Sequence, residues 1–142
     1  RPFLCPADRF CSFDFLKELL NDEYILEGDF SEKSGYENAK TLMNLKTPPT
    51  GILTSNDVCA FGVMRYLKEM NLIPGKDISV IGFDNVSLSQ HWQPQLTTIA
   101  QPFRKIGFLL MESLLDMIHG RDQFPHKLVQ PDLIIRESTG PV

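Results

Sequence analysis

The chain has 142 residues and a net charge of −4 at pH 7, with 42% hydrophobic and 23% charged residues. This composition is typical of a globular domain, and a chain of this length buries about 70% of its unfolded surface. It contains neither an apolar run near the roughly 20 residues of a membrane span nor the clustered Lys and Arg of a nucleic-acid-binding face, so any DNA contact requires residues outside this chain.

Short apolar runs alternate with longer stretches of helical period, which is typical of repeated β-α units and predicts an α/β fold with a mainly parallel sheet. In the first third of the sequence we predict strands at 2–5 and 24–30 and helices at 15–22 and 34–45. The prolines that follow the second helix end it, because proline lacks the backbone donor that a helix needs.

The middle of the chain predicts a strand at 51–55, a helix at 57–71 and a buried strand at 78–83. Either Ser55 or Asn56 can cap the N-terminus of this helix. Helical spacing predicts that its buried stripe consists of Val58, Phe61, Met64 and Leu67.

A further extended run at 96–100 precedes a long amphipathic helix at 103–120, which Gly120 ends as a cap. We expect its apolar residues to point inward: Ile106, Leu110, Leu114 and Met117. A closing strand lies within 128–138, and Pro131 predicts an edge position because proline interrupts a central ladder.

Candidate binding residues follow the strands, because ligands of open α/β sheets bind beyond the carboxyl ends of the strands. These residues are Phe30, Ser55, Asn56, Asp84, Asn85, Gln101 and Phe103. Carboxylate and amide groups bridge paired hydroxyls, and a flat ring covers an apolar face, so the set suits a sugar or a nucleoside. Three of them also have a local alternative: Asn56 as a helix cap, Asp84 as a turn residue bonded to nearby amides, and Gln101 as a solvated loop residue.

Signals for catalysis and metal binding are weak. The three histidines are scattered without metal spacing, and no serine sits in a strand-to-helix elbow. We therefore expect no metal, no cofactor and no enzyme activity. Three cysteines without CxxC spacing favour a reduced, cytoplasmic setting. The chain starts at Arg1 without Met or a signal-peptide pattern, so we expect the N-terminal part of the protein to lie outside this sequence.

Four segments carry a family resemblance: "GDFSEKSGYENAKTLM", "PPTGILTSNDVCAFGVMRYLKEMNLIPGKDISVIGFDN", "PQLTTIAQPFRKIG" and "LIIREST". In wording and spacing they closely resemble the effector-binding region of the LacI/GalR family of bacterial transcription regulators, from about Arg9 to Thr139. The resemblance implies a type I periplasmic-binding-protein-like fold, with two α/β lobes around a cleft. Residues 1–98 would form the C-terminal lobe, 99–130 a crossover and the last helix of the N-terminal lobe, and 131–142 the return crossover and tail.

The resemblance also implies which residues contact the effector. They are Arg9, Phe30, Asn56, Asp84 and Gln101, with Phe103 as a possible apolar wall. The strand-end argument selects all of them except Arg9. Ser12 stands where the family usually has Gly, and Asn85 replaces the common second Asp of the family motif.

The function implied is that of a ligand sensor. A small effector, a sugar or sugar phosphate, would bind between the lobes of a homodimer and change the spacing of helix-turn-helix domains that are absent from this sequence. The alternative is a periplasmic or secreted sugar-binding protein of a transport system, which shares the fold. An enzyme on this fold is a third, more distant alternative.

Overall fold

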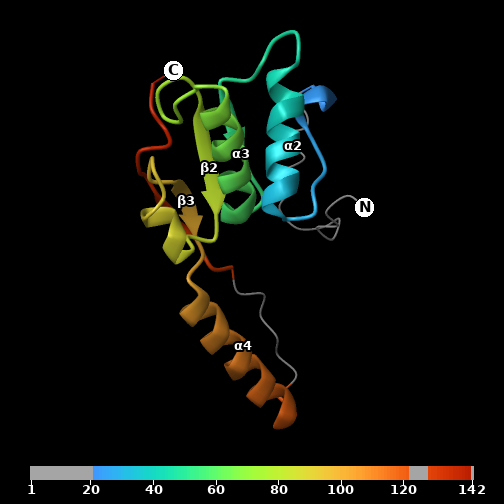
Figure 1. Ribbon diagram of the computed structural model, residues 1–142. Helices are drawn as coiled ribbons and strands as arrows, with labels where there is room; N and C mark the ends of the chain where they lie inside the picture. The colour runs from blue at the N-terminus through green and yellow to red at the C-terminus, as the bar shows by residue number, and fades with distance from the viewer. Residues whose placement is uncertain (1–20, 122–127, 142) are drawn as a thin grey trace.

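The computed structural model describes residues 21–121 and 128–141. Within these ranges it contains a sheet with strand order β1-β2-β3-β4 (Figure 1). The strands are β1 (Gly51–Leu53), β2 (Ser79–Phe83), β3 (Thr97–Ala100) and β4 (Asp132–Ile134). The first three are parallel to one another, and β4 is antiparallel to β3. The predicted α/β fold with a mainly parallel sheet is confirmed.

Two helices pack together beside the sheet. Helix α2 (Glu32–Met43) begins at Ser31, whose hydroxyl accepts from the Ser34 amide, and α3 (Asp57–Glu69) lies between α2 and β2 (Figure 1). The two helices approach closely at Gly35 and Gly62. A Cβ atom on Gly62 would lie 1.9 Å from the carbonyl oxygen of Glu32, so this crossing requires glycine.

The hydrophobic core lies between the sheet and this helix pair. Its buried residues are Ala39, Leu42, Ile52, Ala60, Phe61, Val63, Met64, Tyr66, Leu67, Ile78, Val80 and Leu96. The predicted stripe of α3 is confirmed at Phe61, Met64 and Leu67 and wrong at Val58, which is 42% exposed. Val58 shares the solvent-facing side of α3 with Arg65, seven residues further along the helix.

The predicted strand at 24–30 is wrong. A short 3₁₀ helix, η1 (Asp22–Tyr24), precedes irregular backbone that leads into α2. The carbonyl of Glu27 accepts from the side chain of Asn38, and the Asp29 carboxylate accepts from the Ser31 amide. These bonds tie the segment to the start and middle of α2, although Tyr24 and Leu26 still pack against the core. The strand predicted at 2–5 lies outside the described residues, as does most of the helix predicted at 15–22.

The C-terminal tail returns along the sheet. Strand β4 pairs with β3 and is an edge strand of the described sheet, as Pro131 predicts. Beyond it, the hydroxyl of Ser138 donates to the Val80 carbonyl and accepts from the Thr97 amide. The tail therefore joins β2 and β3 near their N-terminal ends.

Helix α4 (Phe103–Ile118) projects away from the sheet and the other helices (Figure 1). The expectation that its apolar face points into a core is wrong for this chain, because none of its residues is buried. Leu110, Leu114 and Met117 are 66%, 45% and 52% exposed. Gly120 follows the helix with a φ of 69°, which confirms it as the predicted cap. None of the helices in the described ranges has the length and hydropathy to span a bilayer.

Candidate functional site

The ends of three neighbouring strands place the candidate residues at one edge of the sheet. Leu53 pairs with Ile81, and Phe83 pairs with Ile99. Because β1, β2 and β3 are parallel, the residues that follow them emerge on the same side. Asn56, Asp84 and Gln101 are these residues.

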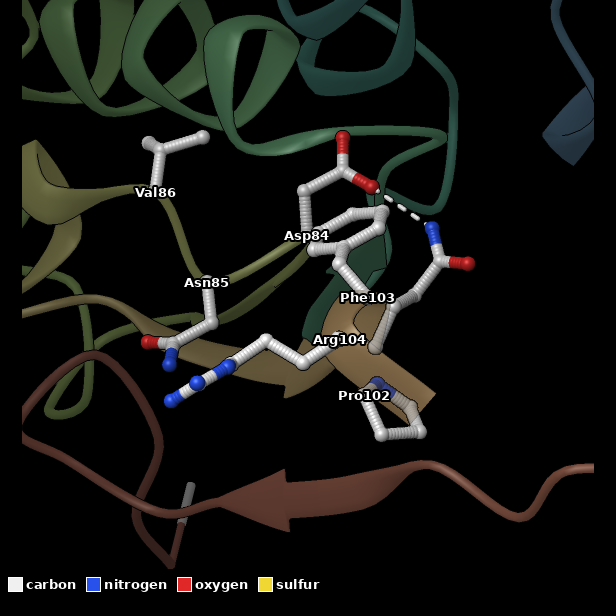
Figure 2. A pocket seen from close by; sticks show the side chains of 7 residues that line it. Asp84, Asn85, Val86, Pro102, Phe103 and Arg104 are labelled. Atoms are coloured by element: carbon white, nitrogen blue, oxygen red, sulfur yellow. Dashed lines mark hydrogen bonds between the residues drawn. The ribbon is translucent and has the colours of Figure 1, made fainter. Parts of the chain in front are cut away.

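Asp84 and Gln101 contact each other directly. The Gln101 amide nitrogen donates to one carboxylate oxygen of Asp84 over 2.8 Å (Figure 2). They border an open hollow with a volume of about 560 Å³. Its lining consists of Asp84, Asn85, Val86, Gln101, Pro102, Phe103 and Arg104.

Asn56 and Phe30 form a second contact at the same edge. The Asn56 side-chain oxygen accepts from the Cys59 amide at 2.8 Å, so the predicted helix cap is confirmed. Its side-chain nitrogen donates to the Phe30 carbonyl at 3.1 Å. Phe30 has a φ of 67° and a side chain that is 42% exposed. Asn56 therefore both begins α3 and fixes the backbone that presents the Phe30 ring.

The structure thus gathers part of the predicted set. It brings Asp84, Gln101 and Phe103 around one hollow, whereas Phe30 and Asn56 do not line that hollow. Arg9 lies outside the described residues. That these residues contact an effector stays a prediction.

A buried carboxylate, which the sequence analysis did not select, makes hydrogen bonds to β3 and to the turn after β2. Asp57 is fully buried, and its two oxygens accept from the Thr98 hydroxyl at 2.5 Å and the Val86 amide at 2.8 Å. The Thr98 hydroxyl also accepts from the Asn85 amide at 3.2 Å. A single polar cluster therefore links the first turn of α3, strand β3 and the turn that follows Asp84.

Burial controls the protonation of Asp57. Loss of solvation raises the pKa of its carboxyl above the ordinary value, and the nearby Asp84 charge raises it further. The hydrogen bonds from Thr98 and Val86 and the charge of Arg136 act in the opposite direction. The sequence does contain a signal for this cluster. Thr97 and Thr98 are hydroxyl residues within an apolar strand, and Asp57 is an acidic residue in the first turn of an apolar helix.

Asp29, in the loop before α2, behaves differently because it is exposed. Hydrogen bonds from the hydroxyl and amide of Ser31 lower the pKa of its carboxyl to about 2. Asp29 therefore carries a negative charge next to Phe30 throughout the physiological pH range.

This arrangement suits binding. The Asp84 carboxylate offers acceptors, the Gln101 amide offers a donor and an acceptor, and the exposed Phe103 ring offers an apolar face. In the described part of the chain, no three His, Cys, Asp or Glu side chains are grouped closely enough to hold a metal ion.

A model of the periplasmic binding protein-like domain matches residues 17–139. The chain belongs to this family. Its similarity to curated regulators is comparable in extent: it is 39% identical over 122 residues to the transcriptional repressor CytR of Escherichia coli K12 and 36% identical over 120 residues to the repressor PurR of Vibrio vulnificus. These alignments cover 85% and 84% of this chain but 36% of each relative. The chain therefore spans about a third of the length of these repressors.

The similar solved structures include regulators of the LacI type. A lac repressor dimer bound to operator and the anti-inducer ONPF is 36% identical with a TM-score of 0.76, over 81% of this chain and 40% of that one. A LacI family regulator from Enterococcus faecium with bound ribose is 34% identical with a TM-score of 0.67, over 82% and 43%. The resemblance to the LacI/GalR family is confirmed, and so is the periplasmic-binding-protein-like fold.

Proposed function

We propose that this chain is the ligand-sensing part of a LacI-type transcriptional repressor and that its effector is a sugar or sugar phosphate. The observation that carries this proposal is the convergence of Asp84, Gln101 and Phe103 on one hollow at the carboxyl edge of the sheet. Paired hydroxyls of a sugar match the acceptors and donors there, and its apolar face matches the ring. Arg104 also lines the hollow, and its guanidinium suits an anionic group such as a phosphate.

One related structure supports a sugar-like ligand. The Enterococcus faecium regulator, which is 34% identical to this chain, holds ribose. Ribose belongs to that protein, and the polar residues at the carboxyl ends of β2 and β3 support a similar ligand for this chain.

The proposal extends to the whole protein. Residues 1–98 belong to one lobe, 99–130 reach into a second lobe, and 131–142 return to the first. The exposed apolar face of α4 supports this division, because a second lobe would cover it. The complete protein acts in the cytoplasm as a homodimer, and a helix-turn-helix domain outside this chain contacts operator DNA.

Signalling then requires that the effector binds one arrangement of the two lobes more tightly than the other. An effector that bridges the lobes changes their angle only to the extent that it prefers one arrangement, and a coupling of about 1–3 kcal/mol is typical. The changed angle alters the spacing of the two DNA-binding domains in the dimer.

A periplasmic or secreted sugar-binding protein is the second candidate function, since it shares the fold. The similarity to two repressors favours the regulator. A helix-turn-helix encoded upstream in the same gene supports the regulator, whereas a signal peptide there supports the transport protein.

Binding to the full-length protein tests the proposal. A thermal-shift screen against sugars, sugar phosphates and purines identifies the ligand class, and calorimetry then measures its affinity. Asp84→Asn should weaken a sugar by about 1.5–3 kcal/mol, because it removes a charged hydrogen-bond acceptor. Asp22→Asn, which makes the same charge change on η1, serves as the control and should leave affinity unchanged. An unaltered affinity in Asp84→Asn would rule out the role of this carboxylate.

A further inference from the structure

The turn that carries Asp84 has an unusual backbone. Asp84 has a φ of 108° and Asn85 a φ of 52°, so two consecutive residues other than glycine adopt positive φ values. Such conformations persist only where the surrounding structure holds them in place. The contacts that hold this turn therefore determine where the Asp84 carboxylate points.

Three backbone amides of the turn are held from one side. The Asp84 amide donates to the Ile99 carbonyl at 2.9 Å, the Asn85 amide to the Thr98 hydroxyl at 3.2 Å and the Val86 amide to the Asp57 carboxylate at 2.8 Å. All three acceptors belong to β3 or α3, within the core of the lobe.

Arg136 holds the turn from the other side. It lies two residues beyond β4, and its guanidinium donates to the side-chain oxygen of Asn85 at 2.7 Å. The same guanidinium donates to the Leu96 carbonyl at 2.6 Å and the Ser89 hydroxyl at 3.1 Å. The backbone amide of Arg136 donates to the Thr97 hydroxyl at 2.8 Å, and this bond holds Arg136 beside β3. Arg136 thus connects the tail to both ends of the segment 85–96.

We propose that Arg136 is a positioning residue for effector binding: through Asn85 it holds the turn that aims the Asp84 carboxylate at the hollow. Lysine cannot reproduce these contacts, because its single nitrogen cannot take the places of both Nη1, which donates to Leu96 and Ser89, and Nη2, which donates to Asn85. Since Arg136 lies two residues beyond β4, it also connects that strand to the turn that carries Asp84. The part of this proposal that concerns affinity rests on the proposed function.

Amide hydrogen exchange in the unliganded full-length protein tests the proposal without any ligand. In Arg136→Gln, the Asn85 and Val86 amides should exchange about ten-fold faster or more, since a hydrogen bond from a charged donor is lost. The core amides of α3 should keep their wild-type exchange rates. Arg65→Gln is the matched control, because it removes an arginine of α3 that also makes a polar contact, an ion pair of 3.3 Å with Glu32 of α2. Unchanged exchange at Asn85 and Val86 in Arg136→Gln would overturn the proposal.

Asn85→Ala removes the acceptor and leaves Arg136 in place, so it tests the same contact if Arg136→Gln fails to fold. It should accelerate exchange at Val86 as Arg136→Gln does. If Arg136 acts through Asn85, the double variant should exchange little faster than either single variant, and fully additive effects would contradict this route.

The affinity arm uses D-ribose and ribose 5-phosphate as probes. If the wild type binds either, Arg136→Gln should weaken that binding about ten-fold while Arg65→Gln leaves it unchanged, and equal weakening in both variants would contradict positioning. If the wild type binds neither, nor any other sugar of the screen, the proposed function fails. The exchange rates at Asn85 and Val86 then still decide the role of Arg136.

Discussion

Asp57 shows how one residue joins distant parts of the chain. Its carboxylate accepts from Thr98, 41 residues later, and from Val86, 29 residues later. It also lies against the backbone of β2, where a Cβ atom on Gly82 would be 2.2 Å from its oxygen. Asp57 thereby keeps the start of α3, which carries Asn56, in register with the turn that carries Asp84.

The raised pKa of Asp57 gives a pH dependence of known sign. Folding favours the protonated carboxyl, so its contribution to stability is complete below the unfolded value of about 3.8 and is lost as pH rises through the folded pKa. Relative to Asp57→Asn, the wild type should therefore have a free energy of unfolding that falls as pH increases above 3.8. Urea denaturation of both proteins over this pH range measures the difference. A difference that rises with pH would contradict the raised pKa.

Local rules predicted some of these residues and not others. Asn56 was foreseen as a cap because capping depends on neighbouring sequence, and Asp84 and Gln101 were foreseen because they follow strands of a parallel sheet. Asp57 and Arg136 were missed because their partners are distant in sequence. Only the folded chain shows that a carboxylate in α3 and a guanidinium in the tail hold the same turn.

Among the elements, the crossing of α2 and α3 depends most on backbone contact. Gly62→Ala would place a methyl group against the Glu32 carbonyl, which cannot move without shifting α2. We expect a loss of about 1–3 kcal/mol in the free energy of unfolding, although alanine favours an isolated helix by about 1 kcal/mol.

Chemical denaturation with Gly51→Ala as a control measures this effect. A Cβ atom on Gly51 would meet Ser79 at 3.8 Å, an ordinary contact distance, so this variant should change stability little. If Gly62→Ala is as stable as Gly51→Ala, the close approach of the helices is not what holds them together.

Within residues 21–121 and 128–141, periodicity located most of the strands and α-helices, and it failed at the strand predicted at 24–30. The strands at 51–55 and 78–83 and the helices at 57–71 and 103–120 correspond to β1, β2, α3 and α4. The segment 24–30 has the composition of a strand, but its polar groups bond to α2 instead. The spacing of apolar residues does not show whether the polar groups of a segment bond to a neighbouring helix instead of a neighbouring strand.

At the scale of the molecule, the proposed second lobe would cover the exposed apolar face of α4. Leu114 is 45% exposed in this chain, but the proposed second lobe would bury it. In the full-length protein, Leu114→Ala should then lower the free energy of unfolding by about 2–5 kcal/mol, as expected for a buried leucine.

Met70 provides the comparison, because it is 55% exposed and terminates α3. Met70→Ala should change the free energy of unfolding by about 0.5 kcal/mol or less. Urea denaturation of both variants measures the contrast. Equally small effects would show that α4 is not covered and would contradict the two-lobe division.

The overall architecture was predictable where the family wording is specific, whereas the apolar periodicity of α4 predicts a buried face that this chain leaves exposed. Periodicity does not indicate what covers such a face, and the proposed two-lobe division assigns that role to sequence outside this chain. The same division would account for the open hollow beside Asp84, because these residues would then build one side of the cleft.

The central claim is that the side chains that follow β2 and β3, those of Asp84, Gln101 and Phe103, hold one small ligand together. A crystal structure of the full-length protein with the sugar or sugar phosphate selected by the screen tests this most directly. The account predicts ligand hydroxyls within hydrogen-bonding distance of the Asp84 carboxylate and the Gln101 amide, with the Phe103 ring against the apolar face. A ligand bound elsewhere, without contact to Asp84 or Gln101, would contradict it.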